Sequence, residues 1–433
     1  SNGQTTVIVG PECVAVLEIP AKVQFKFDEG QLSSVAAQSP YSSITGSCST
    51  QGTSWVTNGI DANAIRFDGA NGNVQIPDNQ LFDASDSGLT YSAWIKAEAL
   101  NPSGHSTIIC KGGGQYMSIV GRYLYFKITT DETSQRYCFG TTQLQDNTWY
   151  HVAVTYDQEG LMKVFINGRQ DGTTQGPFPN PINNTYPLKI GDFVVPGHFD
   201  GIVDELQIHS RGMSEREIRR CKDDAITAYY FPLNEGTGDT AFDGFDLSRQ
   251  AAISGAAWHG NTVLDKKDNS LYFDGINDYV NIPGSGTAFR TDGANGFTLA
   301  AWIKADAAFP AGHDMVIAKA NTYLSVIGGK LIFKTMTGSG TQQRYCYGAT
   351  ALSVNTWYHV AAVYEATGSM KIYLNGELDQ TAGPYTDPTN EVAVSEIGRG
   401  FGVNYFKGII ENVHLYKRGL TGDEIHLLFQ NHE

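Results

Sequence analysis

The sequence predicts an all-β protein made of two antiparallel sandwich domains in tandem. Three observations carry this prediction. The chain has 433 residues, more than one hydrophobic core normally serves, which favours two domains. It contains 48 glycines, 22 tyrosines and 21 phenylalanines, residue types that suit tight turns and pleated sheets. Its second half also repeats the motifs of its first half in the same order.

The repeat keeps one register over a long stretch. Trp94 in YSAWIKA and Trp302 in LAAWIKA are 208 positions apart. The same offset relates Trp149 to Trp357, His105 to His313, Lys111 to Lys319, Arg136 to Arg344 and Gly168 to Gly376. Self-similarity at a fixed offset indicates that one structural unit occurs twice.

Short runs of alternating apolar and polar residues fill both halves. In the first half they span residues 89–97, 123–129, 149–156 and 162–168, and in the second half residues 297–305, 330–336, 357–364 and 370–376. Alternation with a period of two, bounded by Asn-Gly and other glycine-rich turns, is typical of antiparallel strands and hairpins. Each half is therefore expected to form a sandwich of sheets.

Only two segments carry clear helical signals, and each is expected to close its domain. These are MSEREIRRC and LTGDEIHLLF, in which Ser214 and Thr421 are suited to cap the helix N-terminus ahead of acidic residues. We expect an N-terminal extension over residues 1–19, a first domain over 20–221 and a second over 222–433. The linker around Asp223 and Asp224 is then very short, which predicts closely coupled domains.

Charge and cysteine spacing exclude several classes of function. The formal net charge of -15 opposes binding to nucleic acid or to anionic lipid. No apolar run approaches the roughly 20 residues that span a bilayer, so we expect a soluble monomer without membrane insertion. The six cysteines form no C-x-x-C pair, which disfavours a metal–thiolate site, and free buried thiols are favoured over disulfides.

Four motifs together are similar to a known family. They are IRFDGANGNVQIP with LYFDGINDYVNIP, AWIKA, TWYHVAVTYD followed by MKVFING, and FDGIVDELQIHSRGMSEREI. In this order they resemble the laminin-G-like, concanavalin A-like jelly-roll domains of secreted proteins, over nearly the whole chain and twice. The resemblance implies a jelly-roll fold and a secreted or cell-surface location. It leaves function open, because this fold serves many purposes.

The resemblance also implies a structural Ca²⁺ in each domain. The family holds the ion with backbone carbonyls and an acidic side chain on the last strand, where this chain has Asp204 in the first copy and Glu411 in the second. Calcium is a hard cation that takes several oxygen ligands. The remaining oxygens would come from Glu29 and Glu235 and from the chain near Gly69 and Gly275. The alternative is that these acidic residues only solvate turns.

A second repeated set is the candidate ligand-binding site. It comprises His105, Lys111, Arg136 and Tyr137 with their counterparts His313, Lys319, Arg344 and Tyr345. Positive charge and hydrogen-bond donors beside an aromatic face suit a carboxylated or sulfated sugar. Neighbouring residues of a strand point to opposite faces, so Arg136 and Tyr137 are expected to separate. The alternative is a recent duplication that has left these residues unchanged.

Other aromatic and histidine residues divide into two groups. The tryptophans and strand histidines Trp94, Trp149, Trp302, Trp357, His151 and His359 are assigned to the core. Aromatic residues expected at loop tips are secondary ligand candidates, namely Tyr116, Phe178, Tyr186, Tyr323 and Tyr385.

The motifs argue against catalysis. The chain lacks the Glu-x-Asp-x-x-Glu run of glycoside hydrolases of this fold. QIH at 207–209 and YFK at 125–127 resemble alginate-lyase motifs, but their order is reversed and the second copy does not repeat them. We therefore predict noncatalytic binding of a polysaccharide or glycoconjugate, with avidity if both domains engage one polymer. The alternatives are a protein-binding or structural module of an adhesin and, third, a polysaccharide lyase.

Overall fold

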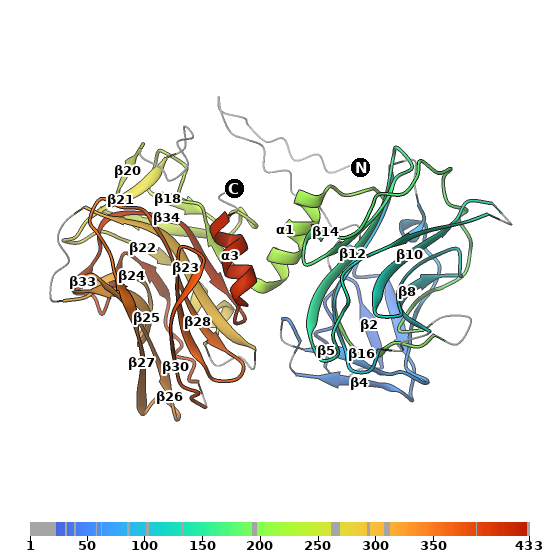
Figure 1. The fold of residues 1–433 in the computed structure, drawn as a ribbon, viewed down its shortest axis with the longest axis horizontal. Helices are drawn as coiled ribbons and strands as arrows, with labels where there is room; N and C mark the ends of the chain where they lie inside the picture. The colour runs from blue at the N-terminus through green and yellow to red at the C-terminus, as the bar shows by residue number, and fades with distance from the viewer. Residues whose placement is uncertain are drawn as a thin grey trace.

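The computed structural model describes residues 23–430 apart from 31–32, 39, 58, 62, 85–86, 101–103, 132–133, 193–196, 261–268, 292–294, 307–311 and 387. Within these residues, large antiparallel sheets form two sandwiches that lie side by side, as predicted (Figure 1). The predicted extension over residues 1–19 lies outside the described residues. Among the described helices, none is both long and apolar enough to cross a membrane.

Domain 1 consists of two sheets, here called A and B. Sheet A has the order β14 (Arg169–Gln170), β13 (Met162–Ile166), β12 (Trp149–Asp157), β7 (Gly88–Ala97), β16 (Asp200–His209), β5 (Ala64–Asp68) and β4 (Thr53–Val56), and β1 (Val23–Phe25) also pairs with β16. Sheet B has the order β11 (Gln135–Phe139), β10 (Tyr123–Thr129), β9 (Gln115–Val120), β8 (His105–Lys111), β15 (Leu188–Ile190), β6 (Val74–Ile76), β3 (Thr45–Cys48) and β2 (Ser34–Ala36). A 3₁₀ turn, η1 (Gln80–Phe82), follows β6.

Domain 2 repeats this plan with sheets C and D. Sheet C has the order β20 (Ala257–His259), β21 (Ser270–Asp274), β34 (Lys407–Tyr416), β23 (Gly296–Ala305), β28 (Tyr358–Glu365), β29 (Met370–Leu374) and β30 (Glu377–Ala382), and β17 (Thr227–Phe231) also pairs with β34. Sheet D has the order β18 (Thr240–Phe242), β19 (Gln250–Ser254), β22 (Tyr279–Ile282), β31 (Ser395–Ile397), β24 (Asp314–Lys319), β25 (Thr322–Ile327), β26 (Lys330–Thr337) and β27 (Gln342–Ala351). Domain 2 also contains the short helix α2 (Ser285–Ala288) and the strand pair β32 (Arg399–Gly400) and β33 (Asn404–Tyr405).

A helix closes each domain, as the capping signals predict. Helix α1 (Glu215–Ile226) begins after Ser214, whose hydroxyl accepts a hydrogen bond from the backbone NH of Glu217. Helix α3 (Gly422–Gln430) begins after Thr421, which accepts in the same way from Glu424. The boundary predicted between residues 221 and 222 falls inside α1, because the helix continues to Ile226 and β17 starts at the next residue.

The alternating apolar residues build one core in each sandwich. Phe67, Phe126 and Val154 lie in the core between sheets A and B, and Phe273, Phe333 and Val360 lie in the core between sheets C and D. The cysteines that the structure describes are all free thiols. Cys48 is half-buried, and the buried ones are Cys110, Cys138, Cys221 and Cys346. Hydrophobic burial, with no disulfide among the described cysteines, stabilises both domains.

The two domains pack through the outer faces of sheets A and C. A separate buried cluster joins them, made of Ile60, Trp94, Ala225, Ile226, Ala300, Ala361, Val363, Tyr373, Tyr416, Leu420 and Ile425. Polar contacts add to it: Lys417 Nζ lies 2.6 Å from a carboxylate oxygen of Asp61, and the Asn295 side chain donates to the carbonyl of Gly59. The guanidinium of Arg418 lies 5.2 Å from the Trp94 ring.

This packing explains a difference from the sequence analysis. Trp94 is buried, as expected, but beneath the opposite domain rather than between the sheets of its own sandwich. Trp302 is buried on the outer face of sheet C, where its ring lies 5.5 Å from that of Phe429 on α3. His151 and His359 lie beside these two tryptophans. The order of layers is therefore B, A, C, D, with helices α1 and α3 between sheets A and C, which leaves the outer faces of sheets B and D at the two ends of the molecule (Figure 1).

Candidate functional site

The repeated Gln-Arg-Tyr-Cys motif occupies the edge strands β11 and β27. Its residues alternate between the two faces of the sheet, as expected for a strand. Cys138 and Cys346 point inward and join the cores. Tyr137 and Phe139 point outward and are 43% and 49% exposed, and the residues directly opposite them on β10 are Lys127 and Tyr125.

The two arginines of this motif do not lie with the tyrosines. The guanidinium of Arg136 is 5.2 Å from the ring of Phe178, and that of Arg344 is 4.8 Å from the ring of Tyr385. Arg344 also donates to Thr337 and Gln342. Both arginines therefore pack against an aromatic side chain on the face opposite to Tyr137 and Tyr345, and a sugar bound to those tyrosines would not contact them.

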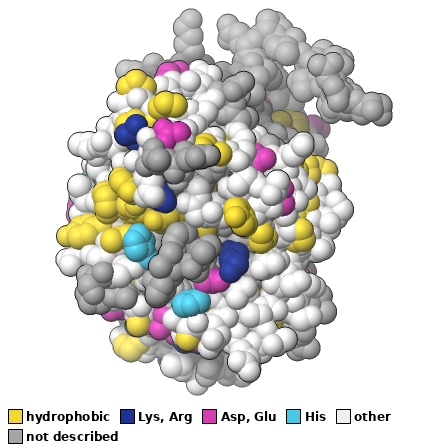
Figure 2. Space-filling model, turned by 90° about the vertical axis from the view of Figure 1, so that its right-hand side faces the viewer, with side chains coloured by type: hydrophobic (Ala, Val, Ile, Leu, Met, Phe, Trp, Pro, Cys, Tyr) yellow, Lys and Arg dark blue, Asp and Glu magenta, His cyan; other side chains and the backbone are white. Residues whose placement is uncertain are grey.

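In domain 1 the outward residues form a continuous patch on sheet B, here called aromatic surface 1. It consists of His105, Tyr116, Tyr125, Lys127, Tyr137 and Phe139. The Tyr125 ring is its centre, with ring centroids at 5.5 Å from His105, 5.7 Å from Tyr137 and 4.7 Å from Phe139. Figure 2 looks onto this end of the molecule, where hydrophobic side chains gather beside His and Lys or Arg side chains.

Lys127, which is only 8% exposed, places a positive charge beneath aromatic surface 1, as the 5% exposed Lys334 does in domain 2. The Lys127 Nζ lies 5.3 Å from the centre of the Tyr116 ring and donates to the carbonyl of Gly113 at 3.2 Å. Burial lowers the pKa of Lys127 and, together with the charge of Lys127, lowers that of His105. The imidazole is therefore neutral near pH 7, while the lysine sits against aromatic ring faces that favour its ammonium form.

Sheet D of domain 2 carries an equivalent patch, aromatic surface 2, on its outer face. It consists of His313, Tyr323, Lys334, Tyr345, Tyr347 and Phe401. The Nζ of Lys334 lies 5.5 Å from the Tyr323 ring centre, 5.8 Å from that of Phe401 and 5.9 Å from that of Tyr345. Tyr345 and Tyr347 are stacked at 5.7 Å, and Tyr347 is 57% exposed.

The two surfaces share a row of outward-pointing glutamine and aromatic side chains on the edge strand, here called the aromatic ladder. In domain 1 the hydroxyl of Tyr137 donates to Gln135 Oε1 at 2.6 Å, and in domain 2 Tyr345 donates to Gln343. Each ladder therefore reads Gln-x-Tyr-x-aromatic on the outer face. These hydrogen bonds hold the tyrosine rings in place, with Tyr137 exposed and Tyr345 half-buried.

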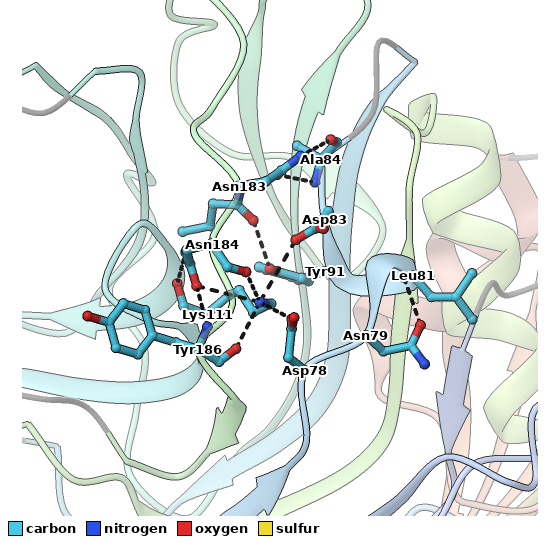
Figure 3. A network of polar contacts seen from close by, with 11 residues as sticks. Asp78, Asn79, Leu81, Asp83, Ala84, Tyr91, Lys111, Asn183, Asn184 and Tyr186 are labelled. Carbon is cyan, nitrogen blue, oxygen red and sulfur yellow. Dashed lines mark hydrogen bonds and ion pairs between the residues drawn. The ribbon is translucent and has the colours of Figure 1, made fainter.

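Lys111 and Lys319, predicted as ligand-binding residues, are buried within the protein. The Lys111 side chain has no exposed surface, and its Nζ lies 2.6 Å from Asp78 Oδ1, 2.6 Å from the carbonyl of Asn184 and 2.8 Å from that of Tyr186 (Figure 3). Lys319 repeats this arrangement with the carbonyls of Gly286 and Phe289 and the side chain of Asn390. Both ammonium groups tie loops to the sheet and do not reach aromatic surface 1 or 2.

The residues predicted to hold Ca²⁺ do not fit the ion as a set. Asp204 is fully buried and its carboxylate accepts backbone NH groups from Ile60, Asp61 and Glu205, at 2.7, 3.3 and 2.8 Å. Oxygens that face NH donors are not oriented toward a cation. Gly69 lies against Asp200. Among the described residues, no group of three or more His, Cys, Asp or Glu side chains is arranged to hold a metal.

The other residues predicted to hold Ca²⁺ are Gly275 and Glu411 in the second domain and Glu29 and Glu235 near the start of each domain. Gly275 lies against Lys407, and Glu411 is buried with 3% exposure. Glu29 and Glu235 each accept one backbone NH through Oε1, from Ala36 and Phe242. The Oε2 atom of each is buried without a hydrogen-bond partner in the described part of the chain. Of the six predicted residues, Glu29 and Glu235 therefore offer oxygen atoms that suit a cation.

Chelation tests the calcium prediction. If Ca²⁺ is held at Glu29 and Glu235, EDTA should lower the melting temperature and added Ca²⁺ should restore it, because an ion that binds only the folded state stabilises that state. The double variant Glu29→Gln, Glu235→Gln should lose this sensitivity. Calorimetry with and without chelator is the measurement, and an unchanged melt of the wild-type protein would contradict a structural calcium.

Three residues of aromatic surface 1 are not among the predicted ligand-binding residues: Tyr125, Lys127 and Phe139. Tyr125 and Lys127 occur in the YFK fragment, which the sequence analysis relates only to a lyase motif. The second copy has Phe333 and Lys334 in the same context, so a repeated Phe-Lys pair was the available signal. Its meaning depends on the pairing of β10 with β11, which brings Lys127 opposite Tyr137.

The sequence matches one family over both domains. The matched residues are 68–219 and 273–426, more than half of the chain, and the matching laminin G family is described as "Concanavalin A-like lectin/glucanases superfamily". The chain belongs to this superfamily. A search of curated proteins gave no match.

Solved structures with this fold are only distantly similar to the chain. Domain 4 of AbnA, a GH43 extracellular arabinanase from Geobacillus stearothermophilus solved with arabinotriose, is 17% identical over 46% of this chain and 97% of its own, with a TM-score of 0.38. The binding domain of Paraclostridial mosquitocidal protein 1 is 13% identical over 88% of this chain and 98% of its own, with a TM-score of 0.43. The binding domain of botulinum neurotoxin DC, solved with rat synaptotagmin II, is 13% identical over 95% and 96%, with a TM-score of 0.40. These likenesses carry no inference about function.

Proposed function

We propose that this chain is a noncatalytic carbohydrate-binding protein, secreted or at the cell surface, that recognises a polysaccharide through aromatic surfaces 1 and 2. One observation carries the proposal: a ladder of glutamine and exposed aromatic rings, with a lysine ammonium beside it, is built at equivalent positions on the outer sheets of both domains. The inner faces of the four sheets form the two cores, and residues on the outer faces of sheets A and C contribute to the interdomain cluster.

The chemistry of the two surfaces suits an acidic sugar. An exposed ring such as Tyr137 or Tyr347 offers a flat apolar face to the C–H side of a pyranose, while phenol, amide and ammonium groups at its margin offer hydrogen bonds. Lys127 and Lys334 would attract a carboxylate or sulfate group, because a charge-assisted hydrogen bond is stronger than a neutral one. Their ammonium groups are the cations that the two surfaces have in common.

Two observations support a noncatalytic role. Burial raises the pKa of Tyr125 and of Tyr323 far above the usual range, so these phenols stay protonated and would be poor bases. The two lyase-like fragments also lie on different sheets. Gln207 and His209 belong to β16 of sheet A, whereas Tyr125 and Lys127 belong to β10 of sheet B, with the core between the sheets. They cannot act on one sugar.

A glycan array tests the proposal. We expect the labelled protein to be retained on polysaccharides that carry uronic acid or sulfate groups and to bind less to neutral polymers of similar linkage. Binding should weaken as salt concentration rises, because part of the attraction is between charges. Absence of binding to every glycan would contradict the proposal and would favour the alternative of an adhesin module that binds protein or acts as a spacer.

A further inference from the structure

We infer that aromatic surfaces 1 and 2 bind two separate polysaccharide chains, so that a single molecule of this protein bridges them. This inference rests on the proposed function and adds a further activity to it. The tandem repeat in the sequence predicts instead that both domains engage one polymer, with a gain in avidity. The layer order of the four sheets decides between these two possibilities.

The two surfaces face away from each other. Sheets A and C meet at the domain interface, and aromatic surfaces 1 and 2 lie on the outer faces of sheets B and D, at the two ends of the molecule (Figure 1). Packed sheets are about 10 Å apart, so three such spacings place the surfaces at least about 30 Å from one another. One polymer would have to pass around both domains to reach the second surface.

The domain interface opposes a rearrangement that would bring the two surfaces together. Helix α1 leads directly into β17 without a loop, and Ile226 at its end belongs to the buried interdomain cluster. Arg220 of the same helix donates to the carbonyl of Phe245 in domain 2, while Gly168 of domain 1 lies against Arg219. The helix is thus packed on both domains.

Two further contacts hold the two domains in one relative orientation. They are the ion pair between Lys417 and Asp61 and the burial of Trp94 in the interdomain cluster. Linked binding sites raise avidity only when geometry allows both to engage one ligand. Two fixed sites on opposite ends fail that condition for one stiff chain. They can instead bind two separate chains, one at each end of the protein.

The experiment uses the full chain and latex beads coated with hyaluronan, a soluble polysaccharide that carries a carboxylate on every second sugar. Wild-type protein should agglutinate the beads, with an optimum at intermediate protein concentration. Two variants each disable one surface: Tyr137→Ala with Phe139→Ala, and Tyr345→Ala with Tyr347→Ala. Each variant should still bind immobilised hyaluronan through its remaining surface but should not agglutinate the beads. An equimolar mixture of both variants should also fail.

The outcomes separate bridging from the proposed function. Wild-type protein that binds immobilised hyaluronan without agglutinating beads overturns bridging and leaves carbohydrate binding intact. A single-surface variant that agglutinates beads as well as wild type also overturns it, because one surface would then suffice. Absence of any binding to hyaluronan overturns the preference for carboxylated sugars and bridging together. Melting curves of both variants should match wild type within a few degrees, since Tyr137, Phe139 and Tyr347 are 43%, 49% and 57% exposed and Tyr345 is half-buried.

Discussion

Replacing Lys111 by methionine is expected to lower the free energy of unfolding by about 3 kcal/mol, an effect of the size seen when one partner of a buried ion pair is removed. Methionine keeps the unbranched side chain as far as Cε but loses the ammonium group. The carboxylate of Asp78 and the carbonyls of Asn184 and Tyr186 would then lose a common donor. Buried acceptors without a donor cost about 1–3 kcal/mol each, and partial exposure of Asp78 reduces the total.

Urea unfolding monitored by tryptophan fluorescence measures this change. The matched control is Lys163→Met, which removes a lysine whose Nζ lies 2.9 Å from Asp157 but whose side chain is 27% exposed. That ion pair should contribute less than about 1 kcal/mol. Equal effects of the two substitutions would contradict the structural role assigned to Lys111, and a selective loss of sugar binding in a stable Lys111→Met protein would return it to the binding site.

Removing the aromatic ladders from both domains is expected to abolish most carbohydrate binding. The quadruple variant Tyr137→Ala, Phe139→Ala, Tyr345→Ala, Tyr347→Ala should weaken the affinity of each surface for a hyaluronan oligosaccharide by roughly 5-fold to 150-fold. Two aromatic contacts at about 0.5–1.5 kcal/mol each correspond to a change of this size. Isothermal titration calorimetry with the oligosaccharide measures it.

Two single variants serve as controls for the ladder. Tyr186→Ala removes a ring that is 63% exposed but outside aromatic surface 1, and Arg136→Ala removes the neighbour of Tyr137 that packs on the other face of β11. Both should bind the oligosaccharide within about twofold of wild type, a difference of less than 0.5 kcal/mol. If Arg136→Ala instead reduces binding as strongly as the ladder variant, the binding face of β11 has been assigned to the wrong side.

The repeated motifs were sufficient to predict the two sandwiches and their closing helices. Alternation over residues 149–156 and 357–364 matches β12 and β28, and Ser214 and Thr421 cap their helices. These features depend on local sequence, where backbone geometry and side-chain pattern suffice. The separation of Arg136 from Tyr137 followed from the same local rule.

Contacts between residues that are far apart in sequence could not be predicted from these local motifs. Lys111 looked functional because it is repeated, but its role depends on Asp78 and on a loop around residue 184, far away in sequence. Trp94 is buried by the other domain, which its own strand pattern does not reveal. Repetition alone therefore does not distinguish a binding residue from a residue that holds the architecture.

The aromatic surfaces show the same limit. Tyr125 and Lys127 gain significance only from the register of β10 against β11, which places them beside Phe139 and Tyr137. The opposite orientation of the two surfaces depends on how sheets A and C pack, and this follows from the interdomain cluster rather than from any single motif. Sequence patterns therefore predicted the strands, whereas the aromatic surfaces depend on how the strands pair and how the domains pack.

A crystal structure of the chain soaked with a hyaluronan tetrasaccharide would locate the binding surface. We expect a sugar ring stacked on Tyr137 and Phe139, or on Tyr345 and Tyr347, with a carboxylate directed toward Lys127 or Lys334. Density for the tetrasaccharide at another place, with both aromatic surfaces open, would contradict this expectation.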